Sequence, residues 1–507
     1  MCGPSIQRKN TMKAKINNNI VLLLAYVAFL VVTLAIVRKH EPWIDEIYAW
    51  QISKFSIGDI IYEMRYEGHF VLWYWILYPF SHLGFPLQTI GVISWAINAL
   101  TIFYLFWKSP FQWWAKMAIL LAIPFLYINP AISRCYVLIP LFLFILAHYY
   151  RLTRDSSLWG KEGDGYIASA ILLALLANTH IYIEGFVGIV SLVLLVQICK
   201  EWKNLNNRFK RRRILALGII AFGVCVAFLQ IYPSLESSSV FQDGSTHSGD
   251  FWDFFVLLIS RQIRVWGAVV FIFIAQCFLL KQSIQLGLVF FVSNLFMVGV
   301  CVLVYGAAIP GRSILWFYYL IFCLWVSCDI HQDKNLIRKI NYTSSIFIVI
   351  FSLILFTPQK IRADYNSYYS EESIFAYYIR DHINDKEPIY SNPNGWSCVI
   401  MEYLPQYHFY NIKDMSSLYP RKDRLGIDSA MATNYIDNIF KANPNKDHIY
   451  IMDCTVGKPN YMERYKVPYE YTTIYPETNN ADHNWYFLKY YLIKINRCHT
   501  KNIVKSE

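Results

Sequence analysis

Long stretches without a charged side chain constrain this chain more than any other feature. An α-helix needs about 18–20 apolar residues to cross roughly 30 Å of hydrocarbon. Uncharged runs at 20–37, 88–107, 283–309 and 342–357 approach or exceed that length. Hydrophobic residues make up 56% of the 507 residues and charged residues only 16%, a balance that is unusual for a soluble protein. The sequence therefore predicts a multi-pass membrane protein.

The apolar runs stop before Lys360, and charged residues become frequent after it. We therefore expect a membrane domain over 1–357 and a water-soluble domain over 358–507. In the second part, helix-like and strand-like pieces alternate, which predicts a small α/β domain. We find no glycine-rich phosphate loop there, so we expect an accessory or acceptor-facing role.

Eleven membrane helices are predicted. They cover 20–37, 88–107, 117–128, 135–150, 166–179, 183–199, 214–231, 266–280, 283–305, 313–328 and 342–357. Lys and Arg are concentrated in the loops on the side of the N-terminus, which is therefore the cytoplasmic side. Eleven crossings then put the C-terminal domain outside the cell membrane, on the same side as the loop that follows the first span.

One aromatic segment, 70–87, is not counted as a crossing, because a crossing there would put the basic loops on the wrong side. It is rich in Trp and Tyr and is interrupted by Pro79, Gly84 and Pro86, as juxtamembrane or re-entrant elements are. The formal net charge of +11 is then a sign of topology and of contact with anionic lipid. A nucleic-acid partner for KRRR at 210–213 is much less favoured, and we expect none.

The first outer loop gathers unusual acidity in HEPWIDEIYAW, at 40–50, and YEGHF, at 66–70. Asp45 and Glu46 are expected to begin a short amphipathic helix. Acids at a helix start also stabilise its dipole, so a purely structural role for this pair is an equal alternative. A second short helix should follow Ser56, and Glu67 and His69 should form a turn at the membrane surface.

Arginines supply the opposite charge in later outer segments. Arg134 lies in NPAISRCY and Arg312 in AAIPGRS, each at the mouth of a predicted span. Such arginines often only anchor a helix at the interface, but a planar guanidinium is also the preferred bidentate donor for a phosphate. Glu184 and His180, in NTHIYIEG, either face the same cavity or pack between helices.

The order of an apolar span, a DE pair on a short helix, an EGH turn and an aromatic stretch resembles the GT-C superfamily of membrane glycosyltransferases. The similarity is to the group of protein O-mannosyltransferases and lipid A aminoarabinose transferase. SRCYVLIP resembles the Arg-x-Tyr segment of bacterial members, and PGRSILWFYYLIF their late Arg-aromatic span. The resemblance covers about 20–330 and implies a GT-C-like fold.

By this resemblance Asp45 matches the catalytic acid of the first outer loop, with Glu46 beside it, while Glu67 and His69 match the second part of that site. Arg134 and Arg312 match basic positions near the donor phosphate. Phe70 and Val71 follow His69 where the family has two prolines. The loop 129–134 lacks the second acid of some relatives, which leaves a divalent metal cofactor open.

The resemblance implies transfer of a sugar from a polyprenyl-phosphate donor to a hydroxyl of a cell-envelope acceptor, which is a glycan, a lipid or a protein. The residue types agree, since a carboxylate can deprotonate the hydroxyl and arginines can stabilise the departing phosphate. A lipid-linked polysaccharide polymerase or flippase is the main alternative, and a non-enzymatic surface anchor is another. The sequence identifies neither the sugar nor the acceptor.

Overall fold

The computed structural model divides the chain into two compact units, which are described separately. The structure describes residues 4–64, 69–154, 165–231, 263–303, 314–366, 369, 371–391, 397–418, 431–456, 460–476 and 488–497. The helical unit comprises Met1–Arg38, Phe55–Leu83 and Thr89–Ile361. The C-terminal unit comprises Lys39–Lys54, Gly84–Gln88 and Arg362–Glu507. The segment 39–54, which carries Asp45, thus groups with the C-terminal residues.

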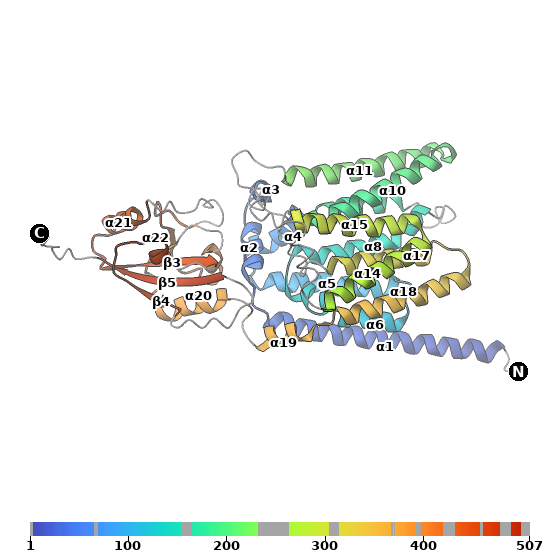
Figure 1. The fold of residues 1–507 in the computed structure, drawn as a ribbon, viewed down its shortest axis with the longest axis horizontal. Helices are drawn as coiled ribbons and strands as arrows, with labels where there is room; N and C mark the ends of the chain where they lie inside the picture. Colours follow the sequence, from blue (N-terminus) through green and yellow to red (C-terminus); the bar gives the residue numbers. More distant parts are fainter. Residues whose placement is uncertain are drawn as a thin grey trace, which may run out of the picture. The chain divides into compact units, whose positions relative to one another are not determined.

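Helices make up the first unit, and their order follows the predicted spans (Figure 1). They are α1 (Pro4–Lys39), α3 (Ile57–Glu63), α4 (Val71–His82), α5 (Thr89–Lys108), α6 (Trp113–Leu121), α7 (Asn129–Ala131), α8 (Leu138–Arg154), α9 (Tyr166–Ala177), α10 (Glu184–Glu201), α11 (Asn207–Ile231), α14 (Ile263–Gln282), α15 (Ile284–Leu303), α17 (Ile314–Asp329) and α18 (Lys334–Ile354). Among the described residues, seven helices are long and apolar enough to cross a membrane. A bent pair at Trp113–Leu121 and Pro124–Ala131 and three shorter apolar helices account for the other predicted spans.

The aromatic segment after His69 forms α4, which has only 12 residues and contains Pro79. At 1.5 Å per residue such a helix is about 18 Å long, too short for the hydrocarbon core. The short helix predicted after Ser56 also forms, as α3. Ser56 Oγ accepts a hydrogen bond from the Asp59 backbone N–H at 3.2 Å and donates to Asp59 Oδ2 at 2.8 Å, so it caps this helix.

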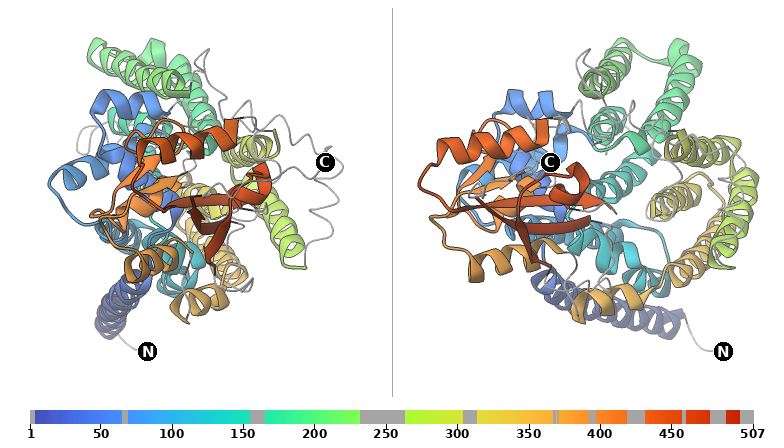
Figure 2. Two further views of the ribbon diagram at one scale, coloured as in Figure 1. Left: turned by 90° about the vertical axis from the view of Figure 1, so that its left-hand side faces the viewer. Right: turned by 60° about the vertical axis from the view of Figure 1, so that its left-hand side comes forward.

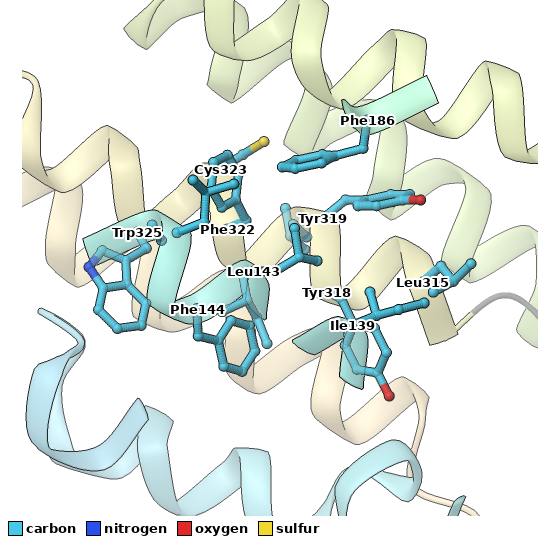
Figure 3. Close-up of a cluster of buried hydrophobic side chains, with 14 of the residues drawn as sticks. Ile139, Leu143, Phe144, Phe186, Leu315, Tyr318, Tyr319, Phe322, Cys323 and Trp325 are labelled. Atoms are coloured by element: carbon cyan, nitrogen blue, oxygen red, sulfur yellow. The ribbon is translucent and has the colours of Figure 1, made fainter. Parts of the chain in front are cut away.

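Helix α17 is the centre of the helical unit, because every side chain from Ile314 to Cys328 is buried. A helix that is apolar on all faces is expected in a protein core or in a membrane, and here other helices bury it. Figure 3 shows its aromatic side chains between α8 and α10, with the Phe186 ring lying flat on Tyr319. The two ring centroids are 5.6 Å apart and the planes differ by 2°.

The outer helices leave large apolar side chains uncovered. Leu24 on α1, Phe222 on α11, Phe273 on α14 and Ile284 on α15 are each more than 60% exposed. Large apolar side chains exposed to this extent on several long helices are unfavourable in water and fit hydrocarbon. The helical unit is therefore the membrane domain of a membrane protein.

A mixed five-stranded sheet forms the core of the C-terminal unit, which confirms the predicted α/β class. The strands are β1 (Ile389–Ser391), β2 (Phe409–Asn411), β3 (His448–Val456), β4 (Tyr471–Tyr475) and β5 (Leu488–Asn496), in the order β2-β1-β3-β5-β4. Strands β1, β2 and β3 are parallel, and β5 pairs antiparallel with β3 and β4.

Helices cover both faces of this sheet. Figures 1 and 2 show α21 (Ala432–Ala442) and α22 (Tyr461–Tyr465) on one face and α20 (Glu371–His382) on the other. Ile436 of α21 packs with Ile451 and Ile493 of the sheet, whereas Phe375 of α20 stacks on Tyr490. Alternate residues of β3 and β5 thus face opposite helical layers.

Candidate functional site

Asp45 and Glu46 begin helix α2 (Ile44–Ser53), as expected from the sequence. Glu46 Oε2 accepts a hydrogen bond at 3.1 Å from the backbone N–H of Trp43, which precedes the helix. Both acids lie in the first turn, where negative charge is favourable. Ile47 and Trp50 are fully buried, so the apolar face of α2 packs on protein.

Glu46 also belongs to a buried charged triad. His40 Nε2 lies 3.0 Å from Glu46 Oε2, and His40 Nδ1 lies 2.8 Å from Asp364 Oδ2. Burial by itself lowers the pKa of the His40 imidazole, but the charges and hydrogen bonds of the two carboxylates outweigh burial and raise that pKa to about 10. The ring is therefore an imidazolium at neutral pH and donates from both nitrogens.

Asp45 is the more exposed member of the acidic pair. Its side chain is half-buried, whereas Glu46 is only 1% exposed and is held by His40 and the Trp43 N–H. Successive residues on an α-helix point about 100° apart, so the two carboxylates cannot share one target. Of the pair, Asp45 is the one that a substrate can reach more easily.

In the helical unit, His69 and His180 form an isolated antiparallel bridge, with ring centroids 4.7 Å apart. Arg134 Nη2 lies 2.6 Å from His69 Nε2. His180 Nε2 lies 3.1 Å from the Tyr136 hydroxyl, and His180 Nδ1 accepts the Tyr182 backbone N–H at 3.1 Å. Three short segments that are distant in sequence thus meet at one place.

These contacts assign the imidazole protons. A guanidinium can only donate, so His69 Nε2 is the acceptor and the proton of the neutral ring is on Nδ1. His180 Nδ1 accepts a backbone N–H, so the proton of that ring is on Nε2 and is donated to Tyr136. The positive charge at this place is then carried by Arg134.

His69, Cys135 and His180 are a candidate metal group, because one ligand atom from each lies within 4.8 Å of the others. Nitrogen and sulfur donors suit zinc better than magnesium. However, both nitrogens of His180 and the Nε2 of His69 already have hydrogen-bond partners, and a guanidinium lies against His69. This arrangement fits an anion better than a cation, and a divalent metal stays a prediction from the family resemblance.

Two of the predicted site residues, Glu67 and Arg312, lie outside the described residues. Asp45 and Glu46 are in the C-terminal unit, and His69 and Arg134 are in the helical unit.

Four residues that take part in these clusters, His40, Cys135, Tyr136 and Asp364, were not singled out from the sequence. Tyr136 and Cys135 lie in the quoted SRCY segment, and His40 is the first residue of HEPWIDE. A histidine so close to a predicted acidic site is a usable signal. Its partner Asp364 is 324 residues away and carries no local signal.

No family model matches this chain, and no curated protein sequence matches it. One solved structure that is similar is ArnT from Cupriavidus metallidurans bound to undecaprenyl phosphate. The two chains are 12% identical with a TM-score of 0.47, and the match covers 93% of this chain and 97% of that one. The bound lipid belongs to that protein.

Proposed function

We propose that this protein is a membrane glycosyltransferase that moves a sugar from a polyprenyl-phosphate donor to a hydroxyl of a cell-envelope acceptor on the outer face of the membrane. The observation that carries the proposal is the contact between Arg134 and His69. Both residues were selected from the sequence for this chemistry, from segments 65 residues apart, and the fold brings them within 2.6 Å.

In the proposed reaction, Asp45 accepts the proton of the acceptor hydroxyl as the oxygen attacks the anomeric carbon of the sugar. The bond from that carbon to the phosphate oxygen breaks, and polyprenyl phosphate leaves with the electron pair. Arg134 stabilises the charge on the leaving phosphate through its fixed donors, and Arg312 is proposed to do the same. His69 keeps the single proton of its neutral ring and donates a hydrogen bond from Nδ1–H to a phosphate or sugar oxygen.

The proposal requires a lipid-linked donor. A panel of polyprenyl-phosphate sugars should support transfer by the purified protein, whereas nucleotide sugars alone should not. Turnover with a UDP- or GDP-sugar and no lipid carrier would contradict the proposed donor. Lipid-linked saccharide that grows by whole repeat units, with no transfer to another acceptor, would favour the polymerase alternative.

Replacement of the proposed base tests the assignment of Asp45. Because general-base catalysis contributes typically ~10²–10⁴-fold, Asp45→Asn should lower kcat by at least about 100-fold at unchanged expression. Asp59→Asn is the matched control, since Asp59 is an exposed acid at the start of α3 in the same predicted loop. Wild-type turnover in Asp45→Asn would remove Asp45 from the mechanism.

Replacement of Arg134 tests the phosphate site separately. Arg134→Ala should raise the KM for the lipid donor and lower kcat, and Arg134→Lys should restore only part of both, because an ammonium lacks the planar pair of donors. The exposed Arg338 of α18 provides the control. Equal effects of Arg134→Ala and Arg338→Ala would show that general surface charge, and not a phosphate site, is responsible.

A further inference from the structure

The first outer loop is bonded to residues more than 300 positions further along the chain. Gln51 Nε2 donates to the Cys398 carbonyl at 2.8 Å, and both residues are buried. The Tyr403 hydroxyl donates to the Pro42 carbonyl at 2.6 Å. These contacts join both ends of α2 to the region of the 3-10 helix Ser397–Glu402.

An ion pair at the end of α2 adds to them, since Lys54 Nζ lies 2.6 Å from Glu402 Oε2. The buried triad also links α2 to distant residues, because His40, which precedes α2, contacts Asp364 in α19 (Pro358–Asn366). His40, Glu46 and Asp364 are each less than 9% exposed. A charged group that is buried this completely must keep its partners, so the triad allows little freedom in the placement of α2.

We propose that Asp364, Cys398, Glu402 and Tyr403 of the C-terminal unit form the scaffold that orients α2 and, with it, Asp45. His40 is then the positioning residue that transmits this orientation from Asp364. The proposal rests on the proposed function for the role of Asp45 only. It gives the C-terminal residues a task in catalysis, whereas the sequence suggested an accessory or acceptor-facing domain.

The geometry explains how a residue that touches no substrate can affect the reaction. Glu46 is held at His40, and His40 is held at Asp364, so this link opposes rotation of the first turn of α2 about the helix axis. Asp45 is the neighbouring residue on that turn, and its direction is fixed relative to Glu46. A displacement of about 1 Å at a reacting group can cost about 100-fold in rate.

Asp364→Asn tests the proposal, because it keeps the size of the side chain and removes the charge that holds His40. We expect kcat to fall about 10- to 100-fold while the KM for the lipid donor changes less than about threefold. Amide hydrogen exchange of α2 should accelerate in the variant, and exchange of β3 and β5 should not. Asp364→Glu, which keeps the charge, should recover part of kcat.

The matched control is Asp453→Asn, which breaks another buried ion pair of the same unit. Asp453 lies on β3, is fully buried and accepts from Arg464 Nη2 at 3.0 Å. At an equal loss of Tm, Asp453→Asn should leave kcat and α2 exchange near wild type. If both variants lose the same activity for the same loss of Tm, His40 and Asp364 are only structural and the proposal is wrong.

The proposal can still be tested if Asp364→Asn does not fold or if the wild-type protein transfers no sugar. If Asp364→Asn does not fold, Gln51→Ala and Tyr403→Phe remove single links of α2 and should give the same pattern in weaker form. If the wild-type protein transfers no sugar, the proposed function fails, but exchange of α2 in Asp364→Asn still decides whether the C-terminal unit holds this helix. Unchanged α2 exchange in all three variants would refute the scaffold.

Discussion

The buried His40 should make the stability of the C-terminal unit depend on pH in the alkaline range. The pKa of His40 is raised in the folded protein from 6.5 to about 10 by Glu46 and Asp364. A raised pKa means that the folded state binds the proton more tightly than the unfolded state. The stabilisation is therefore fully present below about pH 6.5 and is lost as the pH rises through about 10.

The size of the effect follows from the same shift. One pKa unit corresponds to about 1.4 kcal/mol, so the triad contributes on the order of 4 kcal/mol at pH 6.5. For a unit of this size, such a contribution amounts to roughly 10 °C in Tm. The slope between pH 6.5 and 10 should approach about 1.4 kcal/mol per pH unit.

The assay compares thermal unfolding of wild-type protein and His40→Gln in detergent at several pH values from 6 to 10. The difference isolates His40 from the lysines, tyrosines and cysteines that titrate in the same range. We expect wild type to melt well above the variant at pH 6.5 and the two curves to converge near pH 10. A difference in Tm that is constant over this range would refute an ionised His40 and the reasoning from its carboxylate partners.

Three other predictions concern the helical unit and the topology. Gly223→Ala should lower Tm, because a Cβ at this position of α11 would lie only 2.5 Å from Ala174 Cβ of α9. Gly218→Ala on the same helix is the control: its Cβ meets nothing within 4 Å, so Tm should rise or stay unchanged. The buried Asn98 Nδ2 donates a hydrogen bond to the Phe125 carbonyl at the helix bend. Asn98→Leu removes this donor and leaves the carbonyl unsatisfied, so it should cost about 1–3 kcal/mol of stability in a thermal unfolding assay. Reporter fusions after Lys360 and within 38–70 should both report an extracytoplasmic location. A cytoplasmic signal from either would overturn the predicted orientation.

The elements that could be predicted from the sequence are those with a local physical cause. The long apolar runs became helices, the Ser56-x-x-Asp59 spacing capped a helix, and Asp45 and Glu46 began one. The re-entrant or juxtamembrane interpretation of 70–87 relied on charge balance, and the short α4 agrees with it. In each case the pattern lies within about twenty residues.

The contacts that define the candidate site have no such local cause. The sequence placed Arg134 and His69 in one site only through a family resemblance, and their hydrogen bond depends on how three segments meet. The partnership of His40 with Asp364 depends on the complete chain. Strands β2 and β4 and helix α22 were also not predicted, because each is five residues or shorter and its pairing is set by neighbours.

Helix α2 has a consequence for the time course of synthesis. His40 leaves the ribosome early, but its partner Asp364 follows 324 residues later. At about 5–20 residues per second, roughly 15 to 65 seconds separate the two. During that interval Gln51 and Lys54 also lack their partners Cys398 and Glu402, and the acidic segment remains unassembled. Its final placement is therefore one of the last steps in the maturation of the protein, and ribosome pausing or a chaperone bound to this loop would act at that step.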